Sequence, residues 1–174
     1  MAEEAEDHGG ETRSTITGAT SPLTGPPLNE LPALLEARPL IWRSAGAAIA
    51  VLALEVYTPG IEFTITGRIK DQGLARQVQD DARFFARAVT GQGHGELRLS
   101  VSGSAGLVQV SSLGGSYDWR GSFRHRAWAD AAGNDLTFSL AWPTAGIGYA
   151  EHQVTGVRDA AQRAVTLWPA GPEP

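Results

Sequence analysis

The histidines offer the widest range of chemistry in this sequence, because a neutral imidazole can bind zinc or act as a general base. No two of the four lie within four residues of each other, so no local pair can start a metal site. His94, His125 and His152 could form a zinc site only if folding brings them together. Scattered surface histidines are the simpler interpretation, so we expect no metal and no cofactor.

Nucleophilic catalysis finds little support. A triad could combine a serine with His125 or His152 and with Asp118 or Asp130, but the G-x-S-x-G turn of serine hydrolases is absent. The chain has no cysteine, which excludes a thiol nucleophile and disulfides. We therefore assign no catalytic residue and favour a protein that is not an enzyme.

Paired carboxylates could serve glycoside hydrolysis. The candidate pairs are Asp80 with Asp81 and Glu55 with Glu62, and the first pair fits the polar face of a helix. The glycines lack the spacing of a phosphate-binding loop.

Arginines are concentrated in residues 119–128, WRGSFRHRAW. In a strand, Arg120, Arg124 and Arg126 would share one face, and His125 would lie on the opposite face. Arginine binds carboxylates and phosphates through two parallel hydrogen bonds, so we predict that these three residues bind another protein, an acidic one. The alternative is a solvent-exposed strand face whose arginines protect a sheet edge.

Charge is distributed unevenly along the chain. Residues 1–30 carry six acids and one base, a net charge of −5, and residues 31–174 carry 13 acids and 13 bases. A neutral body offers no electrostatic attraction to nucleic acid or to an anionic membrane, so neither is an expected partner. We form the hypothesis that the acidic tail lies across the arginine face when no partner is present.

The beginning of the chain has the composition of a disordered tail. Residues 1–29 are acidic and then rich in Ser, Thr, Gly and Pro. An acidic beginning without an apolar stretch is unlike a signal peptide. The longest apolar run, residues 45–54, has about half the length of a membrane span. We therefore expect a cytoplasmic protein.

The elements that must position the polar side chains centre on residues 47–70. Ile61, Phe63 and Ile65 alternate with polar residues, which predicts a strand with one face in water. Residues 47–56 are apolar on both faces, which predicts a central strand, with a helix as the alternative. Between them, Pro59 and Gly60 predict a type II turn with Gly60 at positive φ.

The rest of the chain shows more strand periodicity than helix periodicity. Residues 74–89 and 157–168 have helical spacing, although 74–89 could also be an irregular connection around a short strand at 82–86. Residues 31–40 contain a short helical turn that Pro39 ends. Strands are predicted at 40–42, 96–102, 107–112, 117–128, 136–142 and 150–157.

Three segments, VYTPGIEFTITGR, LTFSLAWPTAGI and VRDAAQRAVTLWP, resemble a group of small uncharacterised actinobacterial proteins. Those proteins have a Y-P-x-G-hydrophobic-E-F-T hairpin, a strand ending W-P-x-x-G-I and a terminal helix ending L-W-P. The similarity covers roughly residues 45–169. Trp119 and Trp128 lie in the region of an aromatic strand, where RGSFRHRA departs from the group's pattern. The group has no assigned activity, so the resemblance implies a fold and no catalytic residue.

Together these patterns predict a mostly β protein, an antiparallel, immunoglobulin-like β-sandwich with a short C-terminal helix and a helical insertion at 74–89. We expect a disordered tail at 1–29, one domain at 30–169 and a loose C-terminus at 170–174. The predicted function is a non-enzymatic protein-binding or assembly module. The alternative is a small-molecule-binding protein or small hydrolase with a cleft near His94, His125 and His152.

Overall fold

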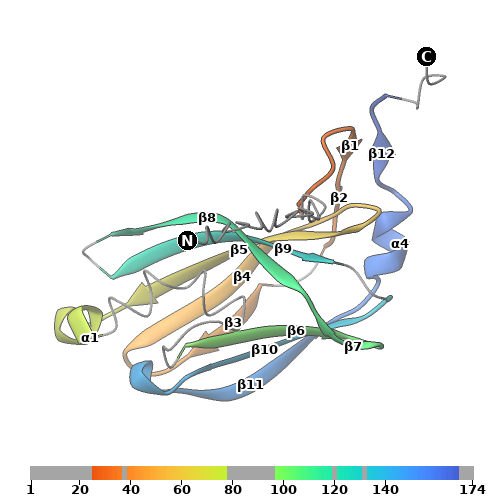
Figure 1. Cartoon of the computed structure of the whole chain (residues 1–174). Helices are drawn as coiled ribbons and strands as arrows, with labels where there is room; N and C mark the ends of the chain where they lie inside the picture. The colour runs from red at the N-terminus through yellow and green to blue at the C-terminus, as the bar shows by residue number, and fades with distance from the viewer. Residues whose placement is uncertain (1–24, 37–38, 78–96, 119–120, 131–132, 169–174) are drawn as a thin grey trace, which may run out of the picture.

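Two antiparallel sheets pack face to face in this protein, and a separate two-stranded ribbon lies at one end (Figure 1). The computed structural model describes residues 25–36, 39–77, 97–118, 121–130 and 133–168. The predicted mostly β, antiparallel sandwich is therefore confirmed. Most of the predicted tail at 1–29, most of the helix at 74–89 and the C-terminus at 170–174 lie outside the described residues.

The larger sheet is built around the predicted hairpin of β4 and β5, and β8 forms one of its edges. On the opposite side, β2 and β3 both pair with β4, one near each of its ends. In spatial order the strands are β2 (Ala33–Leu34) and β3 (Leu40–Arg43), then β4 (Ala47–Val56), β5 (Gly60–Ile69), β9 (Ser122–Asp130) and β8 (Val110–Asp118).

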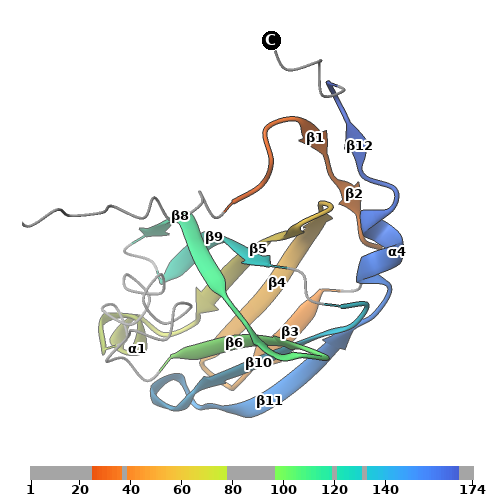
Figure 2. The same ribbon diagram turned by 45° about the vertical axis from the view of Figure 1, so that its right-hand side comes forward.

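The smaller sheet covers one face of the larger one (Figure 2). The chain passes from its edge strand β7 directly to β8 of the larger sheet, through the single residue Gln109. In spatial order its strands are β11 (Ile147–Val154), β10 (Leu136–Trp142), β6 (Arg98–Gly103) and β7 (Gly106–Val108). A short 3-10 helix, η1 (Pro143–Ala145), connects β10 to β11.

The core between the sheets contains the side chains that the alternating patterns placed inside. Ile61, Phe63 and Ile65 of β5 are fully buried, as predicted. Phe63 meets Phe138 of the opposite sheet edge to face, with 5.1 Å between ring centroids. The four apolar residues predicted to face inward from β10 are also fully buried, namely Leu136, Phe138, Leu140 and Trp142.

The facing of β4 differs from simple alternation. Ile49 and Val51 are buried, but so are Leu54 and Val56, which alternation puts on the opposite face. The pairing with β5 shifts between Leu52 and Glu55, where Ala53 has a φ of 50°. This β-bulge inserts one extra residue, so both halves of β4 direct their larger side chains into the core.

The hairpin turn is centred one residue earlier than the predicted type II turn at Pro59 and Gly60, so that prediction is wrong. Tyr57 and Gly60 exchange backbone hydrogen bonds of 2.8 and 3.3 Å, which leaves Thr58 and Pro59 as the two loop residues. Gly60 does not have a positive φ. It is needed for space, because a Cβ there would lie 2.3 Å from Cζ2 of Trp128.

The described helices cover parts of the two segments with helical spacing. Helix α1 (Gln72–Gln77) begins where the Asp71 carboxylate accepts the Leu74 N–H at 2.9 Å, an N-cap, and the rest of 74–89 lies outside the described residues. Helix α4 (Val157–Ala161) confirms a short C-terminal helix but does not reach residue 168. Val165 and Thr166 instead form β12.

Two further element predictions are wrong. The described residues 31–36, 39 and 40 are not helical, since β1 (Glu30–Leu31), β2 and the start of β3 lie there. The predicted strand at 117–128 is divided between β8 and β9, which pair with each other as a hairpin. Apolar and polar residues continue to alternate in the sequence between β8 and β9, so the pattern did not show where one strand ends and the next begins.

The ribbon of β1 and β12 stands away from the two sheets, beside α4 (Figure 2). Leu31 and Val165 lie opposite each other in it and are 51% and 57% exposed. The Glu30 carboxylate holds the ribbon to the hairpin turn by accepting hydrogen bonds from the N–H and O–H of Thr58, at 2.6 and 2.7 Å. Six of the nine large exposed hydrophobic side chains among the described residues lie in or next to the ribbon: Leu28, Leu31, Leu34, Val165, Leu167 and Trp168.

Candidate anion-binding site

The outer face of the larger sheet carries rows of polar side chains set by strand register. Directly opposite residues of antiparallel strands place their side chains on the same face. Phe123 and Ile65 point into the core, so the residues that alternate with them point outward. Two adjacent outward rows run across β5, β9 and β8: Thr66, Arg124 and Ser116, and then Arg68, Ser122 and Asp118.

A cavity of about 430 Å³ opens over these two rows. Its volume lies within the usual range of ligand sites. Leu52 supplies an apolar side chain, and atoms of Tyr117 and Phe123 also border the cavity, although these two strand positions face the core. The polar lining consists of two guanidinium groups, one carboxylate and three aliphatic hydroxyls, from Arg68, Arg124, Asp118, Thr66, Ser116 and Ser122. The formal charge of this lining is therefore +1.

Ser122 links two of the charged groups in the cavity. Its hydroxyl accepts a hydrogen bond from Nη1 of Arg68, and its backbone N–H donates to Oδ1 of Asp118 at 3.0 Å. The Thr66 hydroxyl donates to the backbone carbonyl of Phe123 at 3.2 Å. Arg124 forms neither an ion pair nor a side-chain hydrogen bond with another described residue. Its guanidinium can therefore bind an incoming anion without first breaking an ion pair among these residues.

Arg126, the next outward arginine of β9, is already occupied. Its Nε and Nη2 both lie 2.5 Å from Oε1 of Glu62. The Glu62 side chain is only 7% exposed, whereas that of Arg126 is 57% exposed. A buried carboxylate needs such a partner. The same hydrogen bond and charge raise the pKa of Arg126, so this arginine has a structural role.

An aromatic cluster closes the outer face beyond Glu62. The rings of Tyr57 and Trp128 lie 5.7 Å apart, and the indole N–H of Trp128 donates to Oδ1 of Asp130 at 2.8 Å. Burial raises the pKa of the Tyr57 hydroxyl, and the negative charges of Glu55 and Glu62 add to this shift. Tyr57 and Trp128 are both buried, so the two rings form a packed part of the structure.

No protein-family model, curated protein or solved structure matches the chain. The resemblance to small actinobacterial proteins stays an expectation. No helix in the described ranges has the length and apolar character required to cross a membrane.

The predicted arginine set is divided by the structure. Arg124 and Arg126 project from the outer face of β9, and His125 lies on the opposite face, as expected from alternation. Arg120 lies outside the described residues. Sequence reasoning missed Arg68, which belongs to the polar face of β5. Arg68 could have been found from the sequence, because the polar faces of two strands in one sheet both lie on the outer side of that sheet.

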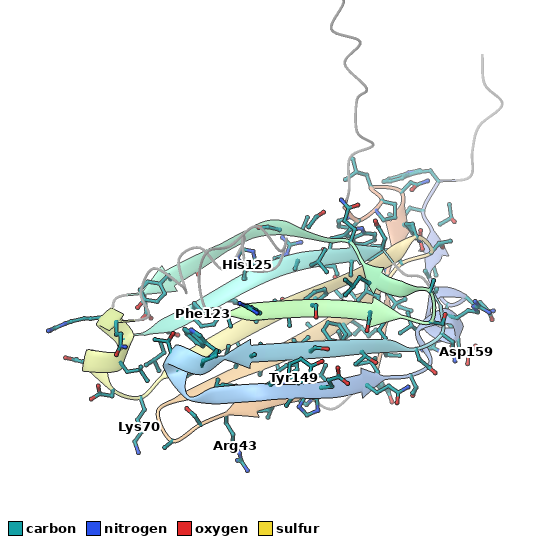
Figure 3. The ribbon with its side chains drawn as sticks, turned by 60° about the horizontal axis from the view of Figure 1, so that its bottom comes forward. Arg43, Lys70, Phe123, His125, Tyr149 and Asp159 are labelled. Carbon is teal, nitrogen blue, oxygen red and sulfur yellow. The ribbon has the colours of Figure 1, made fainter. Side chains whose placement is uncertain are left out.

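His125 lies on the core side of β9, as does Phe123 (Figure 3). Its Nε2 is 2.8 Å from the Ser112 hydroxyl. This is a serine–histidine pair, but the imidazole is only 8% exposed. The two aspartates that were candidates for a triad, Asp118 and Asp130, alternate with His125 and belong to the outer face. The described residues therefore do not assemble that triad.

His152 is far from His125 in the topology, on β11 of the smaller sheet. Its ring meets Trp42 edge to face at 4.7 Å, and its Nε2 lies 3.1 Å from the carbonyl oxygen of Ile41. Trp42 in turn donates its indole N–H to the carbonyl of Ala150 at 2.9 Å. These contacts join β3 to β11, so His152 helps to close the edge of the sandwich.

The remaining candidates also find structural roles or lie elsewhere. His94, Asp80 and Asp81 are outside the described residues. Glu55 and Glu62 lie opposite each other in the β4–β5 hairpin, but Glu62 is bound to Arg126. Within the described ranges, no group of three histidines or carboxylates is placed to hold a metal ion.

Proposed function

We propose that this chain is a non-enzymatic protein-binding module that takes up an acidic segment of another protein in the cavity on the outer face of the larger sheet. The observation that supports the proposal is the difference in ion pairing among three arginines of the outer face. Arg126 is bound to buried Glu62, whereas Arg68 and Arg124 line the cavity without an ion pair to any other described residue. Carboxylates of a partner would form charge-assisted hydrogen bonds with these two groups.

The lining of the cavity favours binding over catalysis. Ser116 and Ser122 supply hydroxyls, but neither His125 nor His152 lines the cavity, so no imidazole of the described residues is placed to activate them. The apolar ribbon supports a protein partner as well, because large exposed apolar patches are typical of protein-binding surfaces.

A binding assay with a defined acidic probe tests the proposal. The probe is a fluorescent twelve-residue peptide of alternating glutamate and serine, titrated with the full chain at about 50 mM salt, where screening is weak. We expect saturable binding that Arg124→Gln or Arg68→Gln weakens about five- to tenfold, the loss typical of one charge-assisted contact in an open site.

Arg98→Gln is the matched control. Arg98 is also exposed on a strand, but it lies on β6 of the smaller sheet, and the substitution changes the net charge by the same amount. It should leave the affinity unchanged. Absence of binding, or an equal loss in Arg98→Gln, would show that the cavity does not recognise carboxylates.

A further inference from the structure

We infer that the chain's own acidic beginning, residues 1–24, occupies the arginine-lined cavity when no partner is bound, and that an acidic partner must displace it. This inference rests on the proposed function, because it concerns the same cavity. It adds a regulatory contact that limits access to Arg68 and Arg124.

The tail and the cavity carry opposite charges. Residues 1–24 carry five acids against the single base Arg13, a net charge of −4, and four of the acids are within positions 3–7. The rest of the chain has 14 acids and 13 bases, close to neutral. The cavity concentrates two guanidinium groups that no described carboxylate pairs with. The densest acidic stretch of the protein thus has the charge opposite to that of two arginines that form no ion pair with a described residue.

The tail joins the body of the protein near the cavity. The described chain begins at Gly25, where a Cβ would lie 3.8 Å from Cδ2 of Leu113 on β8. Three residues further along β8 is Ser116, the first residue of that strand in the cavity lining, about 10 Å away at the usual rise of a strand. The tail therefore starts beside the strand that borders the cavity.

The length of the tail is sufficient for the contact. Residues 8–24 separate the acidic cluster from Gly25, and a chain of 17 residues reaches about 60 Å at full extension. A tether of this kind holds its end at an effective concentration of roughly 1 mM. A tail with a dissociation constant of about 0.1–1 mM would then weaken the apparent affinity of a partner about two- to tenfold.

The test compares two full-length variants that change the net charge equally, from −5 to −2. In the first, the tail is neutralised by Glu3→Gln, Glu4→Gln and Glu6→Gln. In the second, three exposed acids of the body are neutralised by Glu36→Gln, Asp135→Asn and Asp159→Asn. Both are titrated with the glutamate–serine peptide.

We expect the tail variant to bind the peptide about two- to tenfold more tightly than the wild type at about 50 mM salt, and the body variant to bind less tightly than the tail variant. Arg124→Gln added to the wild type and to the tail variant should bring their affinities together. Equal affinities of the tail variant and the body variant would overturn the inference while leaving the proposed function intact. If the peptide binds none of the proteins, the proposed function fails, and the inference fails with it.

Discussion

His125 is a residue whose protonation opposes folding. Burial of the imidazole, which lies beside the Ser112 hydroxyl and opposite Ile65, lowers its pKa below 6.5. Between the lowered pKa and about 6.5, the unfolded chain holds a proton at His125 that the folded chain lacks. The unfolded state therefore gains stability as the pH falls. Neutral His125 stabilises the folded state fully above about pH 6.5, and this stabilisation decreases as the pH falls below about 6.5.

The variant His125→Gln should lose this part of the pH dependence. We expect the free energy of unfolding, measured by urea titration, to fall less between about pH 7.5 and 5.5 in His125→Gln than in the wild type. Ile65→Val, at the directly opposite position, is the control for a general loss of packing. It should lower stability equally at both pH values. An unchanged pH dependence in His125→Gln would mean that this imidazole does not oppose folding at low pH.

For single residues, the sequence indicates which face of the sheet a side chain lies on but not which other side chain it contacts. Alternation alone placed Arg124 and Arg126 outside and His125 on the opposite face. It could not show that Arg126 is the arginine bound to a carboxylate, because Glu62 lies 64 positions from Arg126 and meets it only through the register of β5 with β9. The same register brings Arg68 to the cavity. Strand register is a tertiary property that a local pattern does not contain.

Among the elements, β4 shows how one backbone conformation redirects a whole strand. Ala53 has a φ of 50°, in the left-handed region, which costs an L-residue roughly 1–2 kcal/mol. Glycine has no such cost. It does lower the free energy of unfolding by about 0.4–1 kcal/mol, because it gives the unfolded chain more conformational freedom. We therefore expect Ala53→Gly to stabilise the protein by about 0.5–1 kcal/mol in urea or thermal unfolding.

Ala50→Gly, three residues earlier in the same strand, is the matched substitution. Ala50 has no positive φ, so glycine there should lower stability by about 0.5–1 kcal/mol. A loss of stability in both variants would show that the bulge does not strain Ala53.

The elements predicted incorrectly share a cause. The stripe at 157–168 is helical in period, yet only five residues form α4, and Val165 pairs with Leu31 of β1 instead. An isolated helix of twelve residues is marginal in water, so pairing with a strand from the other end of the chain can replace its last turns. In the segment predicted as a helical turn, Leu31 likewise pairs with β12, and Ala33 and Leu34 pair with β4.

For the molecule as a whole, a sandwich could be predicted because several alternating runs need a shared interior. The order of the strands could not, since β7 and β8 follow each other in sequence but belong to different sheets. The sheets are joined by side-chain contacts that a local pattern does not contain, some of them between residues far apart in the sequence. The edge-to-face meeting of Phe63 and Phe138, both fully buried, is such a contact.

The interaction energy between these two rings directly tests the packing of the two sheets. Phe63→Leu and Phe138→Leu should each lower the free energy of unfolding. The loss in the double variant should be smaller than the sum of the two single losses by about 0.5–1.5 kcal/mol. An aromatic pair contributes about this much beyond its buried area. Urea unfolding of all four proteins measures the difference. In the control cycle, Phe63→Leu is combined with Ile41→Val, a half-exposed edge residue, and the losses should add within about 0.5 kcal/mol. Additive losses for the two phenylalanines would mean that the sheets do not pack through these rings.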